Sequence, residues 1–340
     1  MTKKRIMFVD DEAAILGALS NLLRRERARW DIVFATGGAA ALRELEGEPF
    51  DIVITDMRMP QIDGLDVLAA VKAKSPGTIR IILSGYAESS LVLQALPHVH
   101  QFLSKPCDAK TLRGVIDRCG NDAVLTGLVG SLPCVPSLPA IVDELQHATR
   151  NSSVTIGKLI KICERDPGLA AKVLQIANTA HFRGSDEPTS SIHTAVTVLG
   201  SDTMAALATS PMIALPGNPV SQALIGPLHQ QAVEAAQRAR RSVTDLARTD
   251  DAYTAGLLHG IGRLVLADVL GDRYLPVLRA AETAPLPQCE HELLGVTHRA
   301  VGASLLALWG LPPELVEACE RHHDARATDP GSSAASRAAS

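Results

Sequence analysis

Five short runs of apolar, largely β-branched residues recur through the first 120 residues, and longer segments whose apolar residues have helical spacing separate them. Runs of this length indicate strands, and strands that alternate with helices build a doubly wound sheet. The first part of the chain is therefore predicted to be an α/β domain. The expected strands are Ile6 to Val9, Asp31 to Phe34, Ile52 to Thr55, Ile79 to Leu83 and His100 to Leu103.

From Pro133 onward the strand pattern disappears, and long helix-forming stretches follow, interrupted by proline and glycine. This half is predicted to be all-α. The expected helices are Leu138 to Thr149, Thr155 to Arg165, Gly168 to Ala180, Ile192 to Leu199, Gln222 to Ala247, Asp251 to Leu270, His298 to Trp309 and Pro313 to His323.

These patterns also predict the domain limits. Residues 1–120 form the α/β domain, residues 132–325 form the helical domain, and the segment 121–131 joins them as a linker that could carry a broken helix. Residues 326–340 contain no large apolar side chain. Because burial cannot offset the entropy cost of ordering them, we expect a disordered tail.

Composition excludes several classes of function. The net charge of −4 and the 3% of aromatic residues provide neither a basic field nor stacking platforms for nucleic acid. Six widely separated cysteines without a CxxC pair are typical of buried thiols in a reducing compartment. The first apolar run stops at Asp10, and no later run approaches the length of a membrane span. We therefore expect a soluble, cytoplasmic protein with no direct nucleic-acid or membrane partner.

Polar residues follow the ends of four predicted strands. They are Asp10 and Asp11 after the first strand, Asp56 after the third, Ser84 after the fourth and Lys105 after the fifth. Because ligands of open α/β sheets bind outside the carboxyl ends of the strands, we expect these side chains to converge. Three carboxylates in one pocket require a compensating cation, and all-oxygen ligation selects Mg²⁺ or a similar hard ion. Singly, the same residues could instead be helix caps, a turn residue and a surface lysine.

The first domain resembles the receiver (CheY-like) family over residues 5 to about 118. The segments that carry this resemblance stand in order as Phe-Val-Asp-Asp-Glu, Thr-Asp-Met-Arg-Met-Pro-Gln-Ile-Asp-Gly, Ile-Leu-Ser-Gly-Tyr-Ala-Glu and Phe-Leu-Ser-Lys-Pro. The resemblance implies a flavodoxin-like fold with a five-stranded parallel sheet. It also implies a response regulator of a two-component phosphorelay, phosphorylated by a sensor histidine kinase.

The resemblance assigns a role to each polar residue. Asp56 would accept the phosphoryl group, and Asp10 would act mainly through water. Asp11, Asp56 and the backbone carbonyl of Arg58 would bind Mg²⁺ directly. A carboxylate flanked by Mg²⁺ and the ammonium group of Lys105 is set up for in-line attack on a donor phosphoryl group.

Two further positions match the switch of the receiver family. Ser84 would hydrogen-bond the bound phosphoryl group, and Phe102 stands at the aromatic position that turns inward on activation. Ser84 replaces the commoner threonine, and Phe102 lacks the hydroxyl of the tyrosine often found there. The resemblance also implies a cis bond between Lys105 and Pro106, which would aim the ammonium group at the acidic pocket.

Histidines in the helical half suggest a second site. Neutral imidazoles together with a carboxylate suit Zn, Fe or Mn, so a helical bundle that gathered these residues would hold a metal. In the alternative, His259 is a hydrogen-bonded core histidine within an apolar stretch. The candidate residues are His229, His259, His298, His322, His323 and Asp324.

The helical half resembles the HDOD family, a branch related to the HD hydrolases, over about residues 132 to 325. The His-Asp pair that defines the metal-dependent HD phosphodiesterases reads His259-Gly260 here, and no Gly-Tyr-Pro follows Asp324. Loss of a carboxylate ligand weakens a metal site severely, so no transition metal is expected. The matching segments are Ser-Leu-Pro from 137, Asp-Pro-Gly-Leu-Ala from 166, Ile-Ala-Asn from 176, Ala-Val-Thr-Val-Leu-Gly from 195 and Glu-Leu-Leu-Gly-Val-Thr-His from 292.

We therefore predict a response regulator in which phosphorylation of Asp56 signals to a non-catalytic HDOD module that binds a protein partner. The alternative is a phosphorylation-gated phosphodiesterase for a cyclic nucleotide or dinucleotide such as cyclic-di-GMP. Its metal would be held by His229, His259 and His298, and Gly260 argues against it. Receiver domains often dimerise through their last helices, so a homodimer is a further expectation. Direct DNA binding lacks a basic stripe in the second half.

Overall fold

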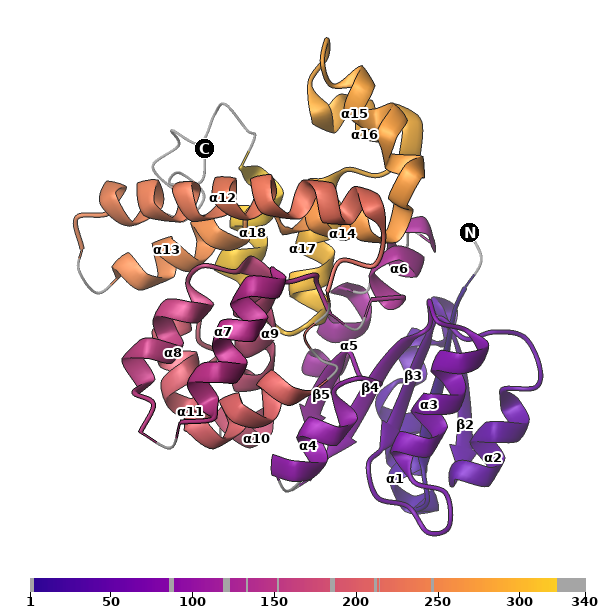
Figure 1. Ribbon diagram of the computed structural model, residues 1–340. Coiled ribbons are helices and arrows are strands. Elements are labelled where there is room, and N and C mark those ends of the chain that lie inside the picture. The colour runs from indigo at the N-terminus through magenta and orange to yellow at the C-terminus, as the bar shows by residue number, and fades with distance from the viewer. Residues whose placement is uncertain are drawn as a thin grey trace. The chain divides into compact units, whose positions relative to one another are not determined.

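The computed structural model divides the chain into two compact units, residues 1–133 and residues 134–340 (Figure 1). Each unit has its own core. The residues that the structure describes are 3–85, 89–118, 123–132, 134–151, 153–183, 187–210, 213, 215–245 and 248–322.

The N-terminal unit is built on a parallel sheet with the strand order β2-β1-β3-β4-β5. All five predicted strands are present, four of them extended by one or more residues and the fifth shifted by one residue, which confirms the doubly wound α/β prediction. Side chains of β1, β3 and β4 are buried in unbroken runs, because helices cover both faces of the sheet. The strands are β1 (Lys4–Asp10), β2 (Trp30–Thr36), β3 (Ile52–Asp56), β4 (Ile79–Ser84) and β5 (Gln101–Ser104).

The helices of this unit follow the strands in alternation, as the periodicity predicts. Asp63 caps the helix α3: its carboxylate accepts from the backbone of Asp66, and the Asp66 side chain accepts from the backbone of Asp63. The elements are α1 (Ala13–Leu22), the 3-10 helix η1 (Arg24–Ala28), α2 (Gly38–Glu44), α3 (Gly64–Lys74), α4 (Ser89–Ala95), α5 (Ala109–Arg118) and α6 (Ala123–Gly130).

The helix α6, which lies in the predicted linker, packs on the N-terminal unit. Arg80 on β4 is buried, and its Nη2 donates to the carbonyl of Gly130 at 3.2 Å. Nδ1 of His100 accepts from the backbone of Arg80, so its Nε2 carries the proton and donates to the same carbonyl at 3.0 Å. A Cβ at Gly130 would clash with the carbonyl of Gly77, so this close approach requires glycine.

The C-terminal unit is entirely helical where the structure describes it, as predicted. Several helices begin at a capping side chain, such as Asp166, Ser191 and Thr297, that accepts a backbone hydrogen bond. The elements are α7 (Pro139–Thr149), α8 (Ile156–Cys163), α9 (Pro167–Ala177), α10 (Ala180–Arg183), α11 (Ile192–Thr209), α12 (Pro219–Ser242), α13 (Thr249–Leu258), α14 (Ile261–Leu270), the 3-10 helix η3 (Gly271–Tyr274), α15 (Leu275–Ala280), α16 (Leu286–Leu294), α17 (His298–Leu308) and α18 (Pro313–Arg321).

Several helix predictions for this unit are wrong in detail. Those for Gly168 to Ala180 and Gln222 to Ala247 run past the observed helix ends at Ala177 and Ser242. The expected single helix from Asp251 to Leu270 is broken at His259 and Gly260, where the carbonyl of His259 accepts from Sγ of Cys319 instead of continuing the helix. The helix predicted to stop at Leu199 continues beyond a kink at Gly200, whose φ is 71°. The expected tail, residues 326–340, lies outside the described residues.

The stretch Thr249–Ala280 is long and apolar enough, by length and composition, to cross a membrane, contrary to the sequence prediction. Most of it is buried within the helical unit, as in the core helices of soluble proteins. The five described cysteines are free thiols, four of them buried. Burial raises the pKa of Cys319 to about 12, so this thiol stays protonated and unreactive at neutral pH.

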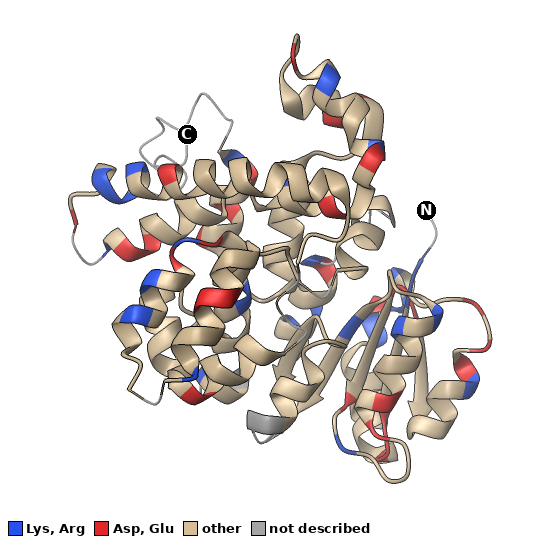
Figure 2. Cartoon of the chain, in the orientation of Figure 1, with Lys and Arg blue, Asp and Glu red and all other residues tan. Residues whose placement is uncertain are grey.

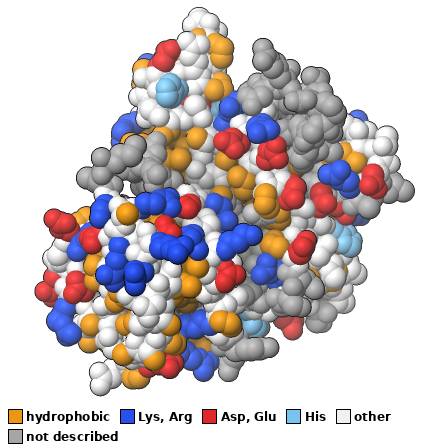
Figure 3. All heavy atoms as spheres, turned by 180° about the vertical axis from the view of Figure 1, so that it is seen from behind, with side chains coloured by type: hydrophobic (Ala, Val, Ile, Leu, Met, Phe, Trp, Pro, Cys, Tyr) orange, Lys and Arg blue, Asp and Glu red, His pale blue; other side chains and the backbone are white. Residues whose placement is uncertain are grey.

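Charge is distributed unevenly. In the helical unit, Lys and Arg are interspersed with Asp and Glu (Figure 2). On one face of the N-terminal unit, by contrast, Lys and Arg side chains gather (Figure 3), and all four arginines of the segment 24–29 are exposed. Glu26 partly neutralises this face through ion pairs with Arg29 and Arg113 at 3.3 and 3.4 Å. The net charge of −4 therefore conceals a local basic face around η1.

The contact between α14 and α17 generates a test of the helical core. A Cβ at Gly262 would clash with the carbonyl oxygen of His298 and lie 2.8 Å from the backbone nitrogen of Gly302, whereas a Cβ at Gly260 would meet nothing within 4 Å. We expect Gly262→Ala to lower the unfolding free energy by about 1–3 kcal/mol in urea titrations, because the helices must separate. Gly260→Ala is the matched control, and equal stability of the two variants would contradict this packing.

Candidate functional site

The carboxyl edge of the sheet brings together Asp10, Asp56 and Lys105. Nζ of Lys105 donates to Oδ2 of Asp10 at 2.8 Å and also to Oδ1 of Asp56. Asp10 is 2% exposed, and its other oxygen accepts from the backbone of Glu12. Oδ2 of Asp56 accepts from the backbone of Arg58 at 2.9 Å. Residues from β1, β3 and the end of β5 thus form one charged cluster, as their positions in the sequence predict.

Lys105 carries a stable positive charge in this cluster. Burial lowers its pKa, but hydrogen bonds and attraction from Asp10 and Asp56 outweigh burial, so the pKa lies above its ordinary value of 10.5. Since the folded-state pKa is raised, the stabilisation from the lysine charge is present below its ordinary pKa of 10.5 and is lost as the pH rises through the folded-state pKa. At neutral pH the lysine is fully charged.

The donor chemistry of this edge suits Mg²⁺. The carboxylates of Asp10, Asp11 and Asp56 and the backbone carbonyl of Arg58 are hard oxygen ligands. Asp11 is exposed, however, and Lys105 contacts the other two carboxylates. Among the described residues, no three His, Cys, Asp or Glu side chains are grouped so that they could hold a metal. Mg²⁺ binding would therefore require Asp11 to turn toward Asp56.

The predicted switch residues lie on neighbouring strands. Ser84 ends β4 and pairs with Ser104 of β5, and its carbonyl accepts from the backbone of Lys105 at 2.9 Å. Phe102 on β5 is half-buried. The peptide bond between Lys105 and Pro106 is cis, as the receiver resemblance implies. The switch roles of Ser84 and Phe102 stay predictions.

In the helical unit, His229 is engaged with Asp166. Nε2 of His229 lies 3.1 Å from Oδ2 of Asp166, and its Nδ1 contacts the carbonyl of Ile225 at 2.8 Å. Asp166 is fully buried and accepts hydrogen bonds from the hydroxyl of Ser137 and the backbone of Leu138. Asp166 thereby joins the N-termini of α7 and α9, and the imidazole of His229 packs against this carboxylate from α12.

The buried residues Tyr274, Glu290 and His298 form a hydrogen-bonded chain. The hydroxyl of Tyr274 donates to Oε1 of Glu290 at 2.7 Å, and both the backbone and Nδ1 of His298 donate to Oε2, at 2.8 and 2.6 Å. Nε2 of His298 in turn lies 3.3 Å from Nε2 of His322. Burial, followed by the charge of Glu290, raises the pKa of Tyr274, so this hydroxyl remains a donor.

Three of the predicted histidines lie together. The rings of His259 and His322 pack edge to face with centroids 4.9 Å apart, and His298 adjoins His322. The described residues do not bring His229, His259 and His298 into one set of metal ligands. The remaining candidates, residues 323 and 324, lie outside the described residues.

Residues that the sequence reasoning missed surround these histidines. Glu290 and Tyr274 fix His298, and Arg263 lies with Gln231 beside His259 in a pocket of the helical unit. Arg263 could have been singled out from the sequence, because it is the one charged residue in the apolar run from Ile261 to Ala267. Glu290 carried no such signal, since it stands among other polar residues in the segment Gln288 to Glu292.

The Lys105 contacts predict a stability that depends on Mg²⁺. Lys105→Met leaves the carboxylates of Asp10 and Asp56 without their cation, so we expect a loss of about 1–3 kcal/mol in urea unfolding without divalent ions. Mg²⁺ should restore more stability to this variant than to the wild type, because it supplies the missing charge.

The exposed Lys110→Met is the control for loss of a lysine elsewhere in this unit. If Lys105→Met and Lys110→Met unfold at the same urea concentration and respond equally to Mg²⁺, the assigned role of Lys105 is incorrect.

Similar proteins share the N-terminal unit. The transcriptional regulatory protein GlrR of Escherichia coli is 34% identical over 113 residues, which cover 33% of this chain and 25% of that protein. The transcriptional regulatory protein FixJ of Bradyrhizobium diazoefficiens is 31% identical over 117 residues, which cover 34% of this chain and 56% of FixJ. The chain therefore spans between a quarter and about half of these relatives.

A solved structure resembles a larger part of the chain. The crystal structure of a virulence factor (cj0248) from Campylobacter jejuni covers 65% of this chain and 80% of its own length, with a TM-score of 0.52 and 21% identity. At this identity the likeness concerns the fold alone.

Family models cover both units. The response regulator receiver domain matches residues 6–117, and the HDOD domain matches residues 135–325. The HDOD match covers more than half of the chain. The chain is therefore a member of the HDOD family that carries an N-terminal response regulator receiver domain.

Proposed function

We propose that Asp56 accepts a phosphoryl group from a sensor histidine kinase and that the HDOD unit transmits the signal by binding a protein partner. The observation that carries this proposal is the contact of Lys105 with both Asp10 and Asp56. It holds a nucleophilic carboxylate beside a fixed cation at the edge of the sheet where ligands bind. We also propose that the protein acts in the cytoplasm.

The residues at this edge suit phosphoryl transfer. Asp11, Asp56 and the carbonyl of Arg58 would hold Mg²⁺, with Asp10 acting through water, and the ion would neutralise charge on the donor phosphoryl group. Asp56 then attacks phosphorus in line, and the bond from phosphorus to the leaving histidine nitrogen breaks. Lys105 would remain beside the new phosphoryl oxygens, and Ser84, at the end of the neighbouring strand β4, would donate to them.

Strand β4 offers a route from this site to the connecting helix. Ser84 lies at its carboxyl end beside the phosphorylation site, and Arg80, four residues earlier, donates to the last residue of α6. Burial lowers the pKa of Arg80 to about 10, so the guanidinium is still charged at neutral pH. A shift of β4 would therefore reach Gly130, four residues before the C-terminal unit begins at Cys134.

Binding rather than turnover is supported by Gly260. The position after His259 supplies no carboxylate, and the nearby carboxylate of Glu290 is engaged by Tyr274 and His298. A metal ligand set with a free carboxylate is therefore missing from this part of the described helical unit. The downstream partner is a protein in this proposal, and dimerisation remains a prediction.

The phosphoacceptor is tested with a small-molecule phosphodonor. Wild type incubated with acetyl phosphate and Mg²⁺ should gain one phosphoryl group by intact mass, and EDTA should prevent this. Asp56→Asn should gain none, because an amide oxygen is a far weaker nucleophile. Asp117→Asn, an exposed carboxylate paired with Arg29, should behave as wild type. Full phosphorylation of Asp56→Asn would remove the basis of the proposal.

The proposed loss of an HD-type metal site is tested by restoring a carboxylate at position 260, directly after His259. Gly260→Asp is sterically allowed, and it places an acidic group beside His259 at the pocket. We expect this variant to retain a stoichiometric transition metal after dialysis, measured by elemental analysis, and to lose it again when His259→Ala is added.

The wild type should retain no such metal and should not hydrolyse cyclic-di-GMP. A stoichiometric metal in the wild type that His259→Ala removes would instead support the phosphodiesterase alternative.

A further inference from the structure

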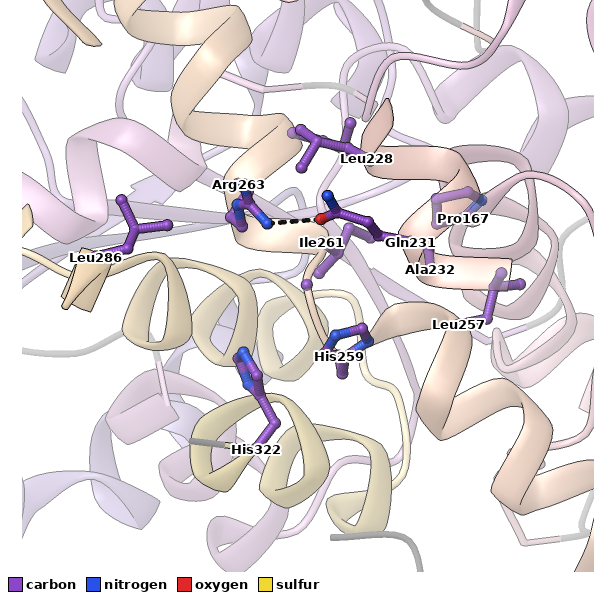
Figure 4. Close-up of a pocket in the computed structure, with 12 residues that line it drawn as sticks. Pro167, Leu228, Gln231, Ala232, Leu257, His259, Ile261, Arg263, Leu286 and His322 are labelled. Atoms are coloured by element: carbon purple, nitrogen blue, oxygen red, sulfur yellow. Dashed lines mark hydrogen bonds between the residues drawn. The ribbon is translucent and has the colours of Figure 1, made fainter. Parts of the chain in front are cut away.

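A pocket of about 270 Å³ lies in the helical unit, where α12, α14 and α18 approach the break between α13 and α14 (Figure 4). Its volume lies just below the range that drug-sized ligands occupy, so it suits a small molecule. The lining is mostly apolar, with a few polar groups. The residues are Pro167, Leu228, Gln231, Ala232, Leu257, His259, Gly260, Ile261, Arg263, Leu264, Leu286 and His322.

The one permanently charged side chain among the described lining residues is positive. Arg263 is a permanent cation, and none of the described lining residues is acidic. In a protein whose net charge is −4, this is a local positive site with low-dielectric walls. Such walls strengthen attraction for an anion, because water screens the charge less.

Arg263 has donor capacity left for a ligand. Its Nη1 donates to Oε1 of Gln231 at 3.0 Å, and the guanidinium also interacts with the hydroxyl of Tyr274. Its buried Nε has no hydrogen-bond partner among the described residues. A guanidinium carries five donors in a planar fork that matches carboxylate and phosphate oxygens. Figure 4 shows Arg263 and the imidazoles of His259 and His322 around the same space.

The two imidazoles are held in place by backbone groups. Nδ1 of His259 lies 2.7 Å from the carbonyl of Gly256, and Nδ1 of His322 lies 2.8 Å from the carbonyl of Cys319. Because a carbonyl can only accept, each Nδ1 carries a proton and the ring orientation is fixed, while Nε2 of His322 lies 3.3 Å from Nε2 of His298. The pocket therefore has a preformed polar end, and an apolar wall that includes Leu228 and Leu286.

We propose that this pocket binds a small organic anion, in which one phosphate or carboxylate group meets Arg263 and a compact apolar or planar body fills the remaining space. The HDOD unit would then respond to a metabolite as well as to phosphorylation of Asp56. The proposal does not depend on the phosphoacceptor, because every residue involved lies in the helical unit.

Calorimetric titration of the full chain tests this site. The probes are adenosine 5′-monophosphate, octanoate and inorganic phosphate, with uncharged adenosine and octanol as matched neutral compounds. We expect saturable binding of at least one organic anion and weaker binding of its neutral partner. Binding of the nucleotide alone identifies a phosphate ester, and binding of octanoate alone identifies a carboxylate.

Substitutions locate the binding. Arg263→Gln should weaken the affinity at least about tenfold, because a charge-assisted hydrogen bond is lost, and Arg263→Lys should weaken it less. Arg279→Gln, at an exposed arginine of α15, is the control and should bind as wild type. Circular dichroism of each variant establishes that it is folded.

Nuclear magnetic resonance gives a second readout. Imidazole signals of His259 and His322 should shift on titration, while those of the exposed His147 and His193 should not. The proposal is overturned if no organic anion saturates the wild type in the millimolar range, or if Arg263→Gln binds unchanged. Binding that a metal chelator abolishes would overturn it as well, since Arg263 would then not be the anchor.

Discussion

The contact of one ammonium group with two carboxylates is the constraint on which the N-terminal unit depends. Asp10 is almost fully buried, and a buried carboxylate is costly unless a cation and hydrogen bonds compensate it. Lys105 provides that charge at 2.8 Å and also contacts Asp56. Asp56, the proposed phosphoacceptor, thereby lies beside a fixed cation. Its position at the carboxyl edge of a parallel sheet follows from the fold.

The helical unit meets the same electrostatic requirement differently. Its buried carboxylates, Asp166 and Glu290, are satisfied by hydroxyl, backbone and imidazole donors. These contacts tie helix termini together and engage His229 and His298. The histidines of the HD-like region are therefore part of the packing, while Gly260 leaves room where a further carboxylate would stand. The proposed binding role of this unit rests on these features.

Much of this could be predicted from the sequence. The strands and the cluster around Asp56 followed from local pattern, because parallel strands end at one edge and carry their terminal side chains there. No comparable rule says which helices pack together. The hydrogen-bonded chain of Tyr274, Glu290 and His298 and the pocket at Arg263 were therefore not predicted. The break at Gly260 was missed because apolar spacing continues across it. The packing of α6 on the N-terminal unit was also not predicted. Arg80, a charged residue inside an apolar strand, was a sign of it in the sequence.

Hydrogen–deuterium exchange of the full chain, with and without acetyl phosphate and Mg²⁺, measures most directly whether the receiver controls the HDOD unit. The account predicts altered exchange at β4, β5 and α6 and also in helices of residues 134–322, all absent in Asp56→Asn. Changes confined to the receiver, or changes in the helical unit that persist in Asp56→Asn, would contradict it.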